Sequence, residues 1–153
     1  MHIQAATTKD IPHLCDLYTE FYRCNALLQP QACLAAIETG EYPKWILQQP
    51  DHTLFLAIYG NNIAGFIHLA IAKTPNYPSV AAHTFGQIVD LFVLENYRRK
   101  GIGAQLVSAA EQWQTSKSLA YLELEVLANN PQAIEFYQQM GWGASRLTLK
   151  SKQ

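Results

Sequence analysis

The sequence predicts a single α/β domain in which a mixed β-sheet is flanked by helices. Its first half contains two strand-like apolar runs around Gly60-Asn61-Asn62, a turn sequence typical of an antiparallel hairpin. Its second half alternates strand-like and helical segments in the order β-α-β-α-β, which joins parallel strands through helices. The chain has 153 residues, 49% of them hydrophobic and 15% charged, so we expect residues 1–153 to form one domain around one core.

The first quarter of the chain predicts a short strand at 3–6 followed by a helix. Thr8 is a suitable N-cap for this helix, and Pro12 stands early in it, where proline is tolerated. The helix would bury an apolar stripe formed by Ile11, Leu14, Cys15, Tyr18, Phe21 and Tyr22. We also expect a second, weaker helix over 31–38, with loop-like residues from 40 to 50.

The remaining elements follow from apolar periodicity and from turn residues. Asp90 interrupts a nearly continuous apolar run that is typical of a buried central strand. Gly141 stands where a helix C-terminus favours a left-handed residue. The expected elements are hairpin strands 53–59 and 63–72, a loop at 73–82, strand 87–93, helix 101–115, strand 120–126, helix 131–140 and a last strand 145–150.

Composition argues against several classes of protein. The net charge of −1 offers no global attraction to nucleic acid or to an anionic membrane, so we expect neither as a partner. The apolar runs are too short to cross a bilayer, and the first residues lack the features of a signal peptide. Three cysteines and five histidines show no metal-ligand spacing, so we expect reduced thiols, a cytoplasmic location and no metal.

Three consecutive cations, Arg98, Arg99 and Lys100, precede the helix expected from residue 101. Cations at a helix N-terminus oppose the helix dipole, and a bound anion would explain them. Gly101 and Gly103 would let backbone N–H groups approach phosphate oxygens closely. The stretch lacks the Gly-Lys-Ser/Thr ending of a P-loop and the third glycine of a Rossmann fingerprint. A basic turn whose glycines merely ease entry into the helix remains the structural alternative.

Two motifs in this half resemble the GNAT superfamily of N-acetyltransferases. Arg98-x-x-Gly101-x-Gly103 matches the superfamily's (Gln/Arg)-x-x-Gly-x-(Gly/Ala) signature. The later motif resembles the acidic strand, Asn-x-x-Ala, aromatic-Tyr and Gly-aromatic series of the same superfamily, and it occupies residues 123–142. The resemblance covers residues 87–142, and it implies a central mixed sheet, mostly antiparallel, with one splayed parallel strand pair.

The resemblance implies acetyl-CoA as co-substrate, held between the splayed strands 87–93 and 120–126. Main-chain groups of the first strand would bind the pantetheine, and the backbone after Arg98 would wrap the pyrophosphate. The implied acetyl-CoA-binding residues are Leu91, Phe92, Val93, Arg98, Arg99, Lys100, Gly101, Ile102, Gly103, Ala104 and Asn130. Asn130, followed by Pro131, is also a suitable helix N-cap.

Acetyl transfer to an amine needs a base for the ammonium proton and an acid for the departing thiolate. The resemblance offers Glu125 and Asp90 as bases and Tyr137 as the acid. Tyr121, Glu123 and Glu125 would share one face of their strand. Each carboxylate could instead belong to a structural ion pair or a solvated position, and Tyr137 could be a core residue on an apolar helix stripe.

The acceptor is expected to be a primary amine, either of a small molecule or of a peptide. Tyr42, Trp45 and Tyr77 suggest an aromatic wall around it, and His83 could face it. Polyamines, aminoglycosides, amino acids and protein amines all stay open. The alternatives are another acyl group, transfer to a hydroxyl, an acyl-CoA sensor without catalysis and a nucleotide-binding protein. A homodimer is compatible with the resemblance.

Overall fold

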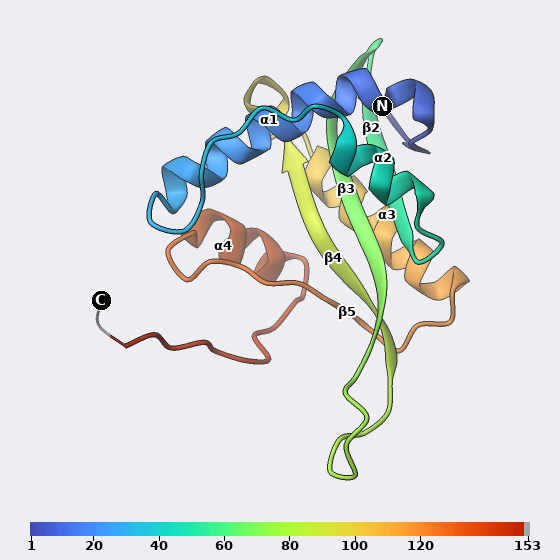
Figure 1. Ribbon diagram of the computed structural model, residues 1–153, viewed down its shortest axis with the longest axis vertical. Coiled ribbons are helices and arrows are strands. Elements are labelled where there is room, and N and C mark those ends of the chain that lie inside the picture. Colours follow the sequence, from blue (N-terminus) through green and yellow to red (C-terminus); the bar gives the residue numbers. More distant parts are fainter. Residues whose placement is uncertain (152–153) are drawn as a thin grey trace.

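The computed structural model describes residues 1–151, in which five strands form one sheet in the order β1-β2-β3-β4-β5 (Figure 1). The first three neighbouring pairs are antiparallel, and β4 and β5 are parallel. This confirms the expected mixed sheet with one parallel pair. The strands are β1 (His2–Ala5), β2 (His52–Tyr59), β3 (Asn62–Lys73), β4 (Thr84–Val93) and β5 (Leu122–Glu123).

Helices cover both faces of the sheet and divide the core into two parts. On one face, α1 (Ile11–Leu28) and α2 (Glu41–Gln48) bury a cluster that includes Tyr18, Phe66 and Phe92. On the other, α3 (Ile102–Ser116) buries Ile88, Leu106 and Trp113. The last helix, α4 (Pro131–Gln139), follows β5 and lies to one side of the sheet in Figure 1.

The start of α1 differs slightly from the expectation. Thr8 is not the N-cap: Asp10 is the N-cap of α1, and Thr7 is the N-cap of a 3₁₀ turn before it. The Asp10 carboxylate accepts hydrogen bonds from the Thr7 N–H (2.8 Å) and hydroxyl (2.9 Å). A short 3₁₀ turn, Thr8–Asp10, then leads into the α-helix, which has Pro12 in its first turn. The apolar stripe is confirmed at its centre, where Leu14 and Tyr18 are fully buried.

The helix expected over 31–38 is wrong, and the helix of this region is α2, within residues expected to be loop. The reason lies in Glu38. Its backbone N–H donates to the Thr19 hydroxyl, and its carboxylate accepts from the N–H groups of Gly40 and Tyr42 at the start of α2. Gly40, with φ of 98°, forms the turn into α2. Glu38 therefore caps the following helix instead of continuing a preceding one.

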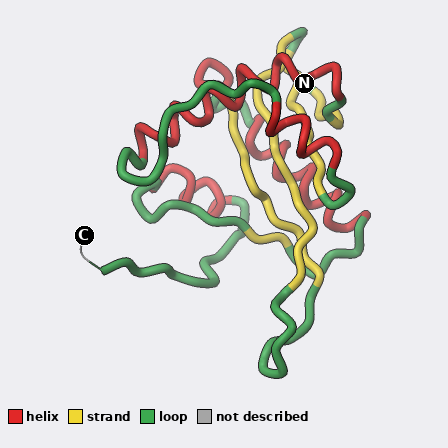
Figure 2. Tube along the Cα trace, viewed as in Figure 1, coloured by secondary structure: helices red, strands yellow, loops and turns green. Residues whose placement is uncertain are grey.

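The second half contains two further corrections. The strand expected over 120–126 is reduced to Leu122–Glu123, because β5 pairs with β4 only at Gly86 and Gln87. The strand expected over 145–150 is absent from the described residues, which run as an unpaired loop after α4 (Figure 2). Leu147 and Leu149 are 75% and 83% exposed there. Gly141 confirms its prediction, with φ of 87° just after α4.

Candidate active site

The parallel pair β4–β5 opens at a β-bulge in β4. His68 pairs with Asp90 and the next residue of β3, Leu69, pairs with Ile88, so Val89 is the extra residue. Before the bulge, the Gly86 N–H donates to Tyr121 of the β5 segment (2.9 Å), and after it the Leu94 N–H donates to Ala64 of β3 (2.9 Å). The N–H groups of even-numbered residues in β4 thus point toward β5 before the bulge and toward β3 after it.

Because of this change, two N–H groups of β4 have no strand partner on the β5 side. Because Leu94 donates toward β3, the alternation of a strand turns the N–H groups of Leu91 and Val93 the other way, toward β5. Pairing with β5 has already ended at Gln87 and Glu123. The two N–H groups therefore point toward the β5 side of β4 and have no strand partner there among the described residues.

The bulge also exchanges the faces of the side chains. Ile88 packs in the core beneath α3, whereas Asp90 and Phe92 contact residues of the α1 face. A regular strand would have placed all three on one side. The Asp90 side chain is only 16% exposed, and its Oδ2 accepts a hydrogen bond from the Tyr18 hydroxyl at 3.2 Å. The bulge thus brings one carboxylate to the opposite side of the sheet from α3.

Asp90 belongs to a chain of polar side chains that sequence reasoning did not find. The fully buried His68 places Nδ1 3.2 Å from Asp90 Oδ2, and its Nε2 lies 2.8 Å from Nδ1 of His52. The Tyr42 hydroxyl lies 3.5 Å from His68 Nδ1. One signal was available: His68 is a lone polar residue within the apolar run 63–72. The network joins β2, β3 and β4 to both helices of this face.

Tyrosines around this network remain neutral hydrogen-bonding groups near pH 7. Burial, reinforced by Asp90, raises the pKa of Tyr18 far above its usual value and that of Tyr42 to about 12. Burial and the hydrogen bond to Glu38 (3.0 Å) raise the pKa of Tyr22 in the same direction. Of the expected aromatic wall, Tyr42 and Trp45 are brought together, with parallel rings 6.0 Å apart, whereas Tyr77 lies in the exposed β3–β4 loop.

The basic loop before α3 lies next to the open end of β4. The Arg98 Nε–H donates to the Val93 carbonyl (2.9 Å), and its guanidinium lies 5.7 Å from the Phe92 ring centroid. Lys100 lies over Tyr59 and Tyr97, at 5.1 and 5.4 Å. Arg98 therefore ties the loop to the strand, and the exposed Arg99 and Lys100 place positive charge at the start of α3.

The first turn of α3 suits an anion. Its N-cap, Gly101, has φ of 76° and supplies no capping side chain, and the first helical bond runs from the Gln105 N–H to the Gly101 carbonyl. The N–H groups before Gln105 thus lack helical acceptors. A Cβ built on Gly101 would meet nothing within 4 Å, so the space beside this turn is open. These features fit a pyrophosphate.

Gly103 has a second function that the sequence did not reveal. A Cβ at this position would lie 3.3 Å from Cζ of Phe136, so the missing side chain allows α4 to approach α3 closely. This contact places Phe136, which precedes Tyr137 in the sequence, against the first turn of α3. An arginine at position 103 would displace Phe136 as well as any ligand of the loop.

Tyr137 lies in α4 between two other aromatic residues. Its ring is 4.9 Å from Phe136 and 5.6 Å from Trp142, and burial raises its pKa to about 12. The hydroxyl is therefore protonated at neutral pH. At the start of the same helix, Asn130 is confirmed as the N-cap, because its Oδ1 accepts from the Ala133 N–H at 3.2 Å.

Glu125 has surroundings very different from those of Asp90. It is exposed, lies beyond the end of β5, and forms neither a hydrogen bond nor an ion pair with residues 1–151. Of Tyr121, Glu123 and Glu125, which were expected to share one face of a strand, only Glu123 lies within β5. Glu123 itself lies 3.4 Å from the Arg146 guanidinium. The role of Glu125 as a base stays a prediction.

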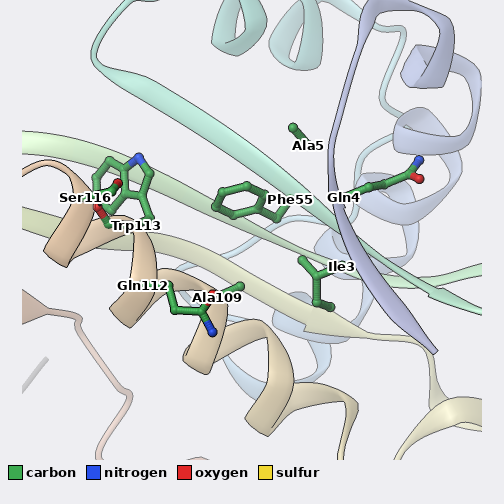
Figure 3. A pocket seen from close by; sticks show the side chains of 8 residues that line it. All are labelled: Ile3, Gln4, Ala5, Phe55, Ala109, Gln112, Trp113 and Ser116. Carbon is green, nitrogen blue, oxygen red and sulfur yellow. Dashed lines mark hydrogen bonds between the residues drawn. The ribbon is translucent and has the colours of Figure 1, made fainter.

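A shallow pocket of about 350 Å³ lies elsewhere, between the β1–β2 edge and α3 (Figure 3). None of the predicted site residues lines it, and it contains no acidic or basic side chain. Its lining is Ile3, Gln4, Ala5, Phe55, Ala109, Gln112, Trp113 and Ser116. Within residues 1–151, no group of three or more His, Cys, Asp or Glu side chains is arranged to hold a metal ion, and no helix is long and apolar enough to cross a membrane.

A sheet with one parallel pair that separates early, next to a helix start that suits a pyrophosphate, is the arrangement that the resemblance to acetyl-CoA-dependent acetyltransferases implies. The acetyltransferase (GNAT) family matches residues 11–142, and the chain belongs to this family. An L-ornithine N5-acetyltransferase of Arabidopsis thaliana is 36% identical over 110 residues, which cover 67% of this chain and 46% of that relative. The chain thus spans about half the length of this relative.

Solved structures share the whole fold. The tetramutant of the BH1408 protein from Bacillus halodurans has a TM-score of 0.93 at 21% identity, with all of both chains covered. The aminoglycoside N-acetyltransferase AAC(6')-Iy in complex with CoA has a TM-score of 0.74 at 18% identity, with 99% of both chains covered. At these identities the likeness is one of fold, and the expected α/β class is confirmed.

Proposed function

We propose that this protein transfers the acetyl group of acetyl-CoA directly to a primary amine. The observation that carries the proposal is the bulge at Val89. It leaves the N–H groups of Leu91 and Val93 on the β5 side of β4 without a strand partner, and it turns Asp90 to the face of the sheet opposite Ile88. One distortion thus prepares a binding edge for the thioester on one side and a proton acceptor on the other.

Acetyl-CoA would lie along β4 with its pyrophosphate at the start of α3. The backbone of residues 99–104 and the cations Arg99 and Lys100 would bind the phosphates. The main chain of Leu91, Phe92 and Val93 would bind the pantetheine. Asn130, at the start of α4, would contact the same ligand while capping its helix.

The protons of the reaction can be assigned to two side chains. An ammonium group loses two protons as it becomes an amide. Asp90 would take the first, which leaves a neutral amine to attack the thioester carbonyl. Tyr137 would give its proton to the CoA sulfur as the C–S bond breaks, and the second amine proton restores the tyrosine. The net products are an N-acetylated amine, CoA and one released proton.

The acceptor side favours a small molecule with a primary amine. Tyr22 and Tyr42, which are partly exposed, offer hydroxyls and ring faces near the carboxylates of Glu38 and Asp90, a setting that suits an ammonium group. The plant relative is named for ornithine, whose side-chain amine fits this chemistry. Peptide amines are the competing acceptor class, and the test below includes them.

The first test is isothermal titration with acetyl-CoA. We expect wild type to bind and the double variant Arg99→Glu/Lys100→Glu to bind at least about tenfold more weakly, a change of about 1.4 kcal/mol. Both side chains are exposed, so the variant should fold. Lys73→Glu/Lys117→Glu makes the same change in net charge at exposed positions away from the loop and should bind like wild type.

The binding protein is then assayed for CoA release with ornithine, a polyamine, an aminoglycoside and a lysine peptide. Turnover with one of the small amines supports the proposal. Absence of binding by folded wild type would refute it. Binding without turnover of any amine would identify an acyl-CoA sensor. Faster turnover of a longer acyl-CoA would show that the transferred group is not acetyl but a longer acyl group.

We propose a homodimer as the assembly. The unpaired segment at residues 144–150 exposes Leu147 and Leu149, and the short β5 has no neighbour on its outer edge within the described sheet. Such an edge pairs readily with a second strand. Light scattering should give twice the mass of the chain, and a monomer at all concentrations would refute this assembly.

A further inference from the structure

The buried network beneath α1 and α2 connects Asp90 with the protein surface through two histidines. His68 is fully buried, whereas His52 is partly exposed at the start of β2. The two rings are 2.8 Å apart between nitrogens, and His68 reaches Asp90 at 3.2 Å. Both nitrogens of the buried His68 imidazole have hydrogen-bond partners, as the burial of a polar ring requires, and none of the proposed acetyl-transfer steps uses this residue.

We propose that His68 is a positioning residue that sets the orientation and the proton affinity of Asp90, and that His52 is the point at which solvent protons reach this network. The inference rests on the proposed function, since it concerns the base of that reaction. Only Oδ2 of Asp90 is engaged, by Tyr18 and His68, and Oδ1 has no partner among residues 1–151. The network thus holds the carboxylate by one oxygen and leaves the other to accept a proton.

The positions of the protons in this network follow from Asp90, the acceptor at its inner end. An ionised Asp90 can only accept, so His68 donates its Nδ1–H to it and turns the lone pair of Nε2 toward His52. His52 then donates its Nδ1–H to His68, and its Nε2 is the atom that takes a proton from water. When it does, the Nδ1 proton can pass across the 2.8 Å contact to His68.

A protonated His68 would form an ion pair with Asp90 and make it a weaker base. The other ionisable groups that face the network are Tyr18, Tyr22, Tyr42, Glu38 and Asp51. The tyrosines stay neutral because burial raises the pKa of each. Burial and the neighbouring His68 lower the pKa of His52, an effect that Asp51 opposes. The network is therefore uncharged at His52 near pH 7, and activity should fall as His52 gains its proton in acid.

The test compares the pH dependence of kcat in His52→Gln with that of wild type on one amine, so that the amine's own titration is common to both. At pH 8 the two should agree within about twofold. As the pH is lowered further below about 6.5, the variant should become up to about threefold faster than wild type, because wild type then gains a proton at His52, whose pKa burial lowers. His68→Gln should lower kcat at pH 8 by about tenfold with unchanged affinity for acetyl-CoA. His13→Gln, at an exposed position of α1, is the matched control and should follow wild type at every pH.

NMR titration of the histidine rings in the free protein gives a readout that needs no acceptor. His52 should titrate below about 6.5, the ordinary value for histidine, and its midpoint should rise in His68→Gln. The proposal is overturned if the ratio of the His52→Gln rate to the wild-type rate does not change with pH. It is also overturned if the titration midpoint of His52 is the same in His68→Gln as in wild type. Wild type without any turnover would instead refute the proposed function, and the NMR titration would still decide whether the two histidines are coupled.

Discussion

Tyr137→Phe is expected to lower kcat by about 10²–10³-fold while the affinity for acetyl-CoA stays within about twofold of wild type. The variant removes one hydroxyl and keeps the ring between Phe136 and Trp142. Burial raises the Tyr137 pKa to about 12, so wild type holds its proton until the thiolate forms. The measurement is steady-state release of CoA, together with titration of acetyl-CoA.

Tyr121→Phe is the matched control, since it removes a hydroxyl from a ring that stacks on Phe85 at 5.0 Å. It should retain the activity of wild type. A Tyr137→Phe enzyme with unchanged kcat would return Tyr137 to the role of a core residue, the alternative that its place on an apolar helix stripe suggests.

Asp90→Asn is expected to lower kcat by about 10²-fold or more, because an amide cannot take the ammonium proton. The change nearly preserves shape, and the amide oxygen can still accept from Tyr18 and His68. The loss should shrink toward high pH, where a larger share of the amine arrives unprotonated. A pH series of kcat on a single amine measures this effect.

Glu125→Gln is the competing variant, because the sequence offered both carboxylates as the base. We expect it to cost less than Asp90→Asn, since Glu125 is exposed and beyond the end of β5. Asp16→Asn, at an exposed position of α1, should change nothing. A larger loss in Glu125→Gln than in Asp90→Asn would identify Glu125 as the base. The proposed role of His52 and His68 would then have no basis.

Local patterns in the sequence were sufficient for most elements of the fold. The Gly-Asn-Asn turn predicted the β2–β3 hairpin, apolar periodicity predicted α1, α3 and α4, and Asn130-Pro131 predicted a cap that the structure contains. The two motifs that resemble the family lie at the start of α3 and along α4. Each of these signals concerns residues within a few positions of one another, which is why the sequence alone determined them.

Tertiary structure decided the features that make the site. The bulge at Val89 depends on how β4 pairs with β3, and it moved Asp90 to the face opposite Ile88 against the alternation of a regular strand. His68 joined Asp90 because strands far apart in sequence are neighbours, and Glu38 capped α2 because Thr19 and Tyr22 hold it there. β5 stopped after Glu123 because its partner had diverged. Pairing across the sheet is non-local, so a periodic pattern along one segment determines that a strand forms but not where it is distorted or which side chains meet across it.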